Sequence, residues 1–64
     1  MKLYIYTTSD MHHVATITGG TNAACERAAA DAYDLNDEYA ATYTPDFGAV
    51  GGLVENDDAE QIAA

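Results

Sequence analysis

The sequence predicts an α+β domain: a small antiparallel three-stranded sheet in the order ββαβ, packed by one main helix and followed by a short C-terminal helix. Two segments near the start alternate with the period of a β-strand. An alanine-rich segment in the middle contains neither Gly nor Pro, which favours a helix. Because no repeat or linker interrupts the 64 residues, residues 1–64 are expected to form a single acidic domain.

The first two strands are expected to form a hairpin. Residues 2–8 alternate aliphatic and tyrosine side chains, and residues 12–18 resume the alternation after a run of turn formers. The face of the hairpin that is expected to be buried carries Leu3, Ile5, Ala15 and Ile17. The face that is expected to be partly exposed carries Tyr4, Tyr6 and Val14.

The main helix is predicted over residues 23–33, after Gly19-Gly20, with Thr21 or Asn22 as its N-cap. Small side chains recur at i, i+3, i+4 and i+7 and form a narrow stripe that lets the helix lie close to the sheet. The stripe consists of Cys25, Ala28, Ala29 and Ala32. We therefore expect a thin core built from small residues.

The last third of the chain gives weaker signals. Residues 38–44 alternate as a third strand that ends at Pro45. Residues 47–54 contain too many glycines for a regular element, and a loop or an irregular edge segment is expected there. Asp57 and Glu60 have the spacing of a capping box, which predicts a short helix over residues 58–63.

The net charge is the most informative property for function. The chain has 11 acidic residues and two basic ones, Lys2 and Arg27, for a formal charge of -9. The acids recur through the segments that are expected to fold, so they belong to a compact acidic domain and not to a tail. Arg27 and Asp31, at i, i+4 spacing, predict one weak ion pair. A field of this sign repels nucleic acid and anionic membranes and favours a basic protein partner.

Catalytic and metal sites are not predicted. His12 and His13 point to opposite faces of a strand, so the two rings cannot easily share an ion. Cys25 is expected on the buried helix face, where nothing activates it. A substrate cleft of roughly 300 Å³ or more would not fit in so small a domain. We expect no enzyme activity and no cofactor. The lone cysteine and the absence of a long apolar run predict a cytoplasmic protein.

The acids gather in two clusters that could imitate the phosphates of DNA. One follows the predicted helix end and the other lies near the end of the sequence, and each would form a ridge of negative charge. Tyrosines and Phe47 add large side chains that often anchor interfaces. The predicted partner-binding residues are Asp31, Asp34, Asp37, Glu38, Glu55, Asp57, Asp58 and Glu60.

Residues 1–8, with the sequence MKLYIYTT, and residues 28–33, with the sequence AAADAY, occur in a small acidic α+β chain with one cysteine. In these features the chain resembles the anti-CRISPR proteins of phages, and it is most similar to inhibitors of type I-C CRISPR systems. The resemblance implies binding to a subunit of Cascade, the RNA-guided surveillance complex, inside the host bacterial cell. The acidic surface of the inhibitor would occupy the basic DNA-binding channel or the motif-reading subunit of this complex. We expect the protein to be a monomer.

Other functions remain open from the sequence alone. A DNA mimic aimed at a restriction enzyme, a nucleoid protein or a repressor would share every feature above. A small antitoxin or adaptor would instead add a strand to an exposed sheet edge, so that its backbone and not its acids would matter. A minor enzyme accessory or an ion-binding domain is the third alternative.

Overall fold

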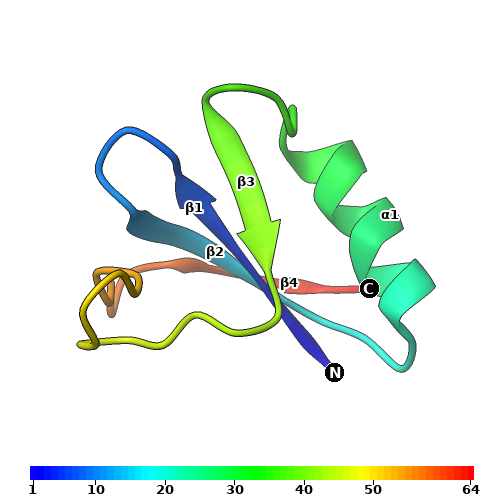
Figure 1. The fold of residues 1–64 in the computed structure, drawn as a ribbon. Helices are drawn as coiled ribbons and strands as arrows, with labels where there is room; N and C mark the ends of the chain where they lie inside the picture. Colours follow the sequence, from blue (N-terminus) through cyan, green and yellow to red (C-terminus); the bar gives the residue numbers. More distant parts are fainter.

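The computed structural model describes all 64 residues as one four-stranded sheet with one helix packed on it (Figure 1). Its elements are β1 (Lys2–Thr7), β2 (His12–Thr18), α1 (Asn22–Ala32), β3 (Tyr39–Thr42) and β4 (Glu60–Ala63). The strands lie in the order β3-β1-β2-β4. The α+β class is confirmed, but the sheet has four strands and is mixed, because β4 runs parallel to β2.

The β1–β2 hairpin forms as predicted, with one irregularity. Ile5 lies opposite Ala15 and Tyr6 lies opposite His13, which leaves Val14 as an extra residue in a β-bulge. The prediction that Val14 shares the face of Tyr4 is therefore wrong. The bulge turns the Val14 side chain toward the helix side, where it packs against the core.

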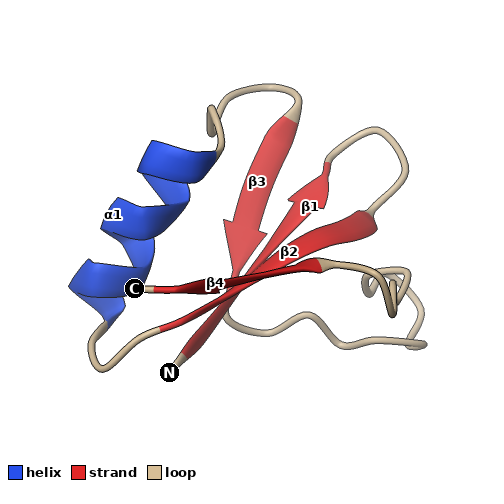
Figure 2. Cartoon of the chain, turned by 180° about the vertical axis from the view of Figure 1, so that it is seen from behind, coloured by secondary structure: helices blue, strands red, loops and turns tan.

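Helix α1 covers one face of the sheet (Figure 2). The Thr21 hydroxyl caps it by accepting a hydrogen bond of 3.1 Å from Ala24 N–H. Ala32 is exposed, so the expected apolar stripe is shorter than predicted. The core between α1 and the sheet consists of Leu3, Ile5, Ala15, Ile17, Cys25 and Ala29. The helix contributes the small residues Cys25 and Ala29, as expected, but the sheet contributes three large aliphatic side chains.

The predicted C-terminal helix over residues 58–63 is wrong. Those residues include strand β4, which pairs with β2 from Glu60 opposite Ala15 to Ala63 opposite Thr18. A helix of six residues is marginal by itself, because the free-energy cost of nucleating it exceeds the stabilisation from so few hydrogen bonds. The outer edge of β2 offers the same backbone groups a ladder of partners, and pairing there also buries Ala59.

The face of the sheet opposite α1 is covered by the segment between β3 and β4. Phe47 packs on Tyr4 with ring centroids 5.5 Å apart, and Leu53 is buried. Val54 forms an isolated parallel bridge to His12. The segment is irregular, as expected. It contains no helix.

No helix of the chain has the length and apolar character needed to cross a membrane.

Candidate partner-binding surface

All eleven carboxylate side chains are exposed. None of them forms a salt bridge with Lys2 or Arg27, so the predicted pair of Arg27 with Asp31 does not form. Holding two long exposed side chains together costs entropy that a single surface ion pair hardly offsets. The acidic charge is therefore uncompensated within the chain and is available to a partner.

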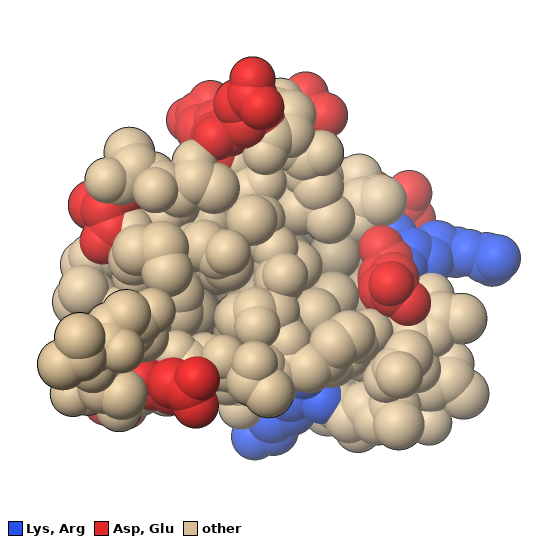
Figure 3. Space-filling model, in the orientation of Figure 1, with Lys and Arg blue, Asp and Glu red and all other residues tan.

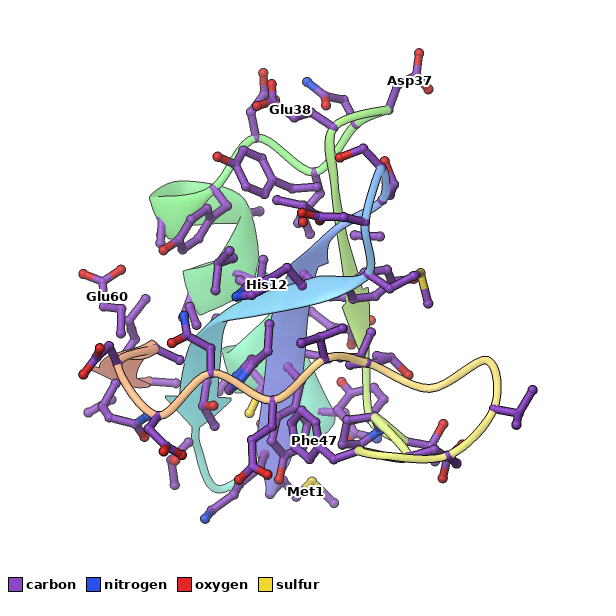
Figure 4. All side chains as sticks on the ribbon, turned by 90° about the vertical axis from the view of Figure 1, so that its left-hand side faces the viewer. Met1, His12, Asp37, Glu38, Phe47 and Glu60 are labelled. Atoms are coloured by element: carbon purple, nitrogen blue, oxygen red, sulfur yellow. The ribbon has the colours of Figure 1, made fainter.

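Four of the predicted residues, Asp31, Asp34, Asp37 and Glu38, form the helix-end cluster, at the end of α1 and in the turn that leads to β3. The backbone of this turn is held by the β1–β2 hairpin. Thr8 N–H donates a hydrogen bond of 3.0 Å to the Glu38 carbonyl, and the Thr8 hydroxyl donates to the Asp37 carbonyl. Asn36 Oδ1 closes the turn by accepting a hydrogen bond of 2.7 Å from Glu38 N–H. Asp37 and Glu38 consequently project from one end of the molecule (Figure 4).

Asp10 is a further acid at this end, and the sequence analysis did not select it. It lies in the same tight turn as Thr8, which contacts the helix-end cluster. The Thr7 hydroxyl donates a hydrogen bond to Asp10 Oδ1, and this bond lowers the pKa of the Asp10 carboxyl. Only the pairing of β1 with β3 brings Asp10 and the cluster to the same end, so no local sequence signal could have found it.

The end of α1 adds to the negative potential of the helix-end cluster. Backbone carbonyls at a helix C-terminus carry partial negative charge. No basic residue stands in the last turn of α1, whereas Asp31 does. Tyr33 N–H donates to the Ala29 carbonyl over 2.9 Å and closes the helix just before Asp34. Charges and dipole therefore have the same sign at this end of the molecule.

The other four predicted residues, Glu55, Asp57, Asp58 and Glu60, form the C-terminal cluster, which lies just before β4 and at its first residue. Asn56 fixes this segment. Its Nδ2 donates to the His13 carbonyl over 3.1 Å, and its Oδ1 accepts from Asp58 N–H over 3.0 Å. Asp57 and Asp58 thus lie in an ordered turn beside β2.

Glu60 departs from the predicted grouping. Its Oε1 accepts a hydrogen bond of 2.9 Å from the Tyr33 hydroxyl, which ties this carboxylate to the residue that ends α1. Burial, followed by this hydrogen bond, raises the pKa of the Tyr33 hydroxyl. On the face that Figure 3 shows, the acids lie in separate groups with a broad uncharged area between them.

The histidines do not belong to the acidic clusters, but His12 lies near Asp10 in the hairpin turn. The His13 ring is buried between Tyr4 and Phe47, and its Nε2 lies 2.7 Å from Thr16 Oγ1 and 3.0 Å from the Ala15 carbonyl. His12 is only half-buried. No group of three His, Cys, Asp or Glu side chains is placed to hold a metal ion, and the surface contains no pocket. What remains as a candidate site is the acidic surface.

Comparisons with protein-family models, curated proteins and solved structures found no match to this chain. The function is therefore argued from charge, exposure and the geometry of the fold. The sequence supplied the eight acids of the two clusters, and the structure adds Asp10 together with the residues that hold the turns, Thr8 and Asn56.

Proposed function

We propose that this protein is an anti-CRISPR inhibitor of the DNA-mimic type. In this proposal a monomer binds the basic DNA-binding surface of a type I Cascade complex and blocks the binding of target DNA. It acts in the cytoplasm of the bacterial host of a phage. The observation that carries the proposal is the exposure of all eleven carboxylates, none of which forms a salt bridge within the chain.

The density of charge supports mimicry of a nucleic acid. The longest dimension of the backbone is 29 Å, and a duplex of that length carries about 17 phosphate charges, at one per 1.7 Å of axis. The protein has 11 carboxylates over the same length. A basic channel built for DNA would therefore meet more than half of the charge it is made to neutralise.

The anchoring of both clusters also supports the proposal. Hydrogen bonds from the backbone N–H and the hydroxyl of Thr8 hold the turn of Asp37 and Glu38, and the Asn56 side chain holds the turn of Asp57 and Asp58. A partner that binds prearranged carboxylates loses less free energy to ordering them. In this mechanism the carboxylates take the positions where Lys and Arg of the complex would hold target DNA, and no catalysis is needed.

The experiment that tests the proposal is competition between the protein and target DNA for purified Cascade. We expect the wild-type protein to bind the complex and to displace labelled target duplex. The eight cluster acids are then replaced by Asn or Gln, which keep size and remove charge. That variant should lose at least about tenfold in affinity, mainly through a slower on-rate. A control variant removes two acids outside the clusters, Glu26 and Asp46, and should retain inhibition.

The same acidic surface suits a restriction enzyme or a repressor, and the competition assay separates these targets. The protein could bind such an enzyme or repressor, displace its DNA, and fail to bind Cascade. That result would support DNA mimicry but show that the target is not Cascade. Binding that survives both 1 M salt and loss of both clusters would contradict DNA mimicry itself, since screening leaves a Debye length of about 3 Å there.

A further inference from the structure

Strand β3 has an unpaired outer edge. It is a terminal strand of the sheet and pairs only with β1. Outside the regular ladders, no backbone or side-chain hydrogen bond reaches the main chain of residues 39–42. A row of free N–H and C=O groups is a template for pairing with another chain.

The register shows which groups are free. Thr8 N–H donates to the Glu38 carbonyl, and Thr7 lies opposite Tyr39. Hydrogen-bonded and non-hydrogen-bonded pairs alternate in an antiparallel ladder, so Ala40 and Thr42 bond inward to β1. The N–H and C=O groups of Tyr39 and Ala41 therefore point outward, while their side chains pack toward the core.

Apart from its shortness, this edge lacks the features by which proteins usually protect terminal strands. Its four residues, YAAT, include no charged residue and no Pro, and its pairing with β1 has no register shift. The edge of β4 differs, because the charged Glu60 is one of its strand residues. Figures 1 and 3 share one view, in which acidic side chains lie at the upper end of β3 and the area over the rest of the strand carries no charged side chain.

We propose that the outer edge of β3 pairs with an extended segment of a partner protein, which adds a fifth strand antiparallel to β3 and carries Lys or Arg just after its paired residues. An antiparallel segment would end beside Tyr39, next to the exposed carboxylates of Asp37 and Glu38. Basic residues at that end would meet these acids. The interface goes beyond the proposed function, since its affinity comes from main-chain hydrogen bonds and not from mimicry of DNA.

The charge also selects against a second copy of this chain. Each copy carries a net charge of -9 and only two basic residues, neither of them near β3 in sequence. Pairing two β3 edges would bring two strongly negative molecules together without a complementary charge. The occupant is therefore a basic segment of a different protein.

The test uses the full-length protein and three synthetic peptides. One peptide is acetyl-Thr-Val-Thr-Val-Thr-Lys-Arg-amide, the second has Lys-Arg moved to its start, and the third ends in Glu-Glu instead. Amide hydrogen exchange is followed by NMR with and without each peptide. We expect the first peptide to bind at least about fivefold more tightly than the second, and the third not to bind. Exchange at Tyr39 and Ala41 should slow at least about tenfold, with little change at Ala40 and Thr42.

A matched pair of variants checks the edge directly. Ala41→Pro removes an outward N–H and leaves the bonds to β1, a substitution that edge strands tolerate, and it should abolish binding of the first peptide. Ala41→Ser keeps the N–H and should bind normally. If the Ala41→Pro variant unfolds, the proposal is tested by whether the first peptide slows amide exchange at Tyr39 and Ala41 of the wild-type protein. Failure of all three peptides to bind, binding without protection of Tyr39 and Ala41, or a homodimer through β3 would each overturn the proposal. A negative result in the Cascade competition assay would not affect the proposal that β3 pairs with a basic segment.

Discussion

The backbone N–H of Thr8 donates a hydrogen bond of 3.0 Å to the carbonyl of Glu38, which lies 30 residues further along the chain. This bond joins the turn of the β1–β2 hairpin to the turn that leads into β3. It holds the helix-end cluster in place, and it sets the register that directs Tyr39 and Ala41 outward. Display of the acids and exposure of the β3 edge thus depend on the same contact.

Thr8→Val removes the hydroxyl that donates to the carbonyls of Asp37 and Glu38 and keeps the backbone bond. We expect a loss of about 1 kcal/mol in the free energy of unfolding, because a typical hydrogen bond contributes about 0.5–1.5 kcal/mol. Chemical denaturation measures this. Ser9→Ala, at an exposed neighbouring position, is the control and should change stability little. Equal stability of Thr8→Val and wild type would show that the hydroxyl does not hold the turn.

Asp31→Asn should stabilise the protein while weakening its binding to a basic partner. Asp31 stands in the last turn of α1, where a negative charge opposes the helix dipole. Removing the charge is expected to raise the free energy of unfolding by about 0.3–1 kcal/mol. Glu26→Gln, earlier in the helix, should have a smaller effect. Denaturant titration at low salt gives the answer, and a less stable Asp31→Asn variant would contradict this reading of the helix end.

Added salt should raise the melting temperature. Eleven exposed acids without salt bridges repel one another, and the Debye length falls from about 10 Å at 0.1 M to about 3 Å at 1 M. Melting followed by circular dichroism across this range should show a steady increase. The variant with eight neutralised cluster acids should show a smaller one. An unchanged wild-type melting temperature would mean that the acids do not destabilise the fold.

Tyr33 should titrate at higher pH than a free tyrosine. Burial and the hydrogen bond to Glu60 favour its neutral form in the folded protein, and they raise its pKa. Its contribution to stability is therefore fully present below pH 10.0, the ordinary tyrosine value, and is lost as the pH rises through the folded pKa. Glu60→Gln should move the pKa of Tyr33 part of the way back, because burial remains. An ultraviolet titration that finds no difference between this variant and wild type would rule out the Glu60 contribution.

The sequence was most informative where local signals were strong. The alternation of β1 and β2 and the alanine-rich run of α1, capped by Thr21, predicted these elements to within about a residue at each end. Local signals failed where pairing with a segment distant in the sequence determined the secondary structure. The capping-box spacing of Asp57 and Glu60 suggested a helix, but the segment pairs with the free edge of β2 and forms strand β4. The bulge at Val14 left no trace in the alternation.

The candidate site shows the same division. Exposure of the eight cluster acids follows from their charge, since unpaired carboxylates are rarely buried. Their grouping does not, because it depends on tertiary contacts. The bond from Tyr33 draws Glu60 toward the end of α1, and the pairing of β1 with β3 places Asp10 at the same end of the molecule as the helix-end cluster. The free edge of β3 likewise became visible only with the strand order.

The central claim is that exposed carboxylates occupy a DNA-binding surface, and inhibition of DNA binding by purified Cascade tests it most directly. The wild-type protein is compared with the variant in which Asn or Gln replaces the acids of both clusters, after each is shown to fold. The account predicts that the wild type blocks target DNA and that the variant needs at least about tenfold more protein to do so. Equal inhibition by both proteins would contradict it.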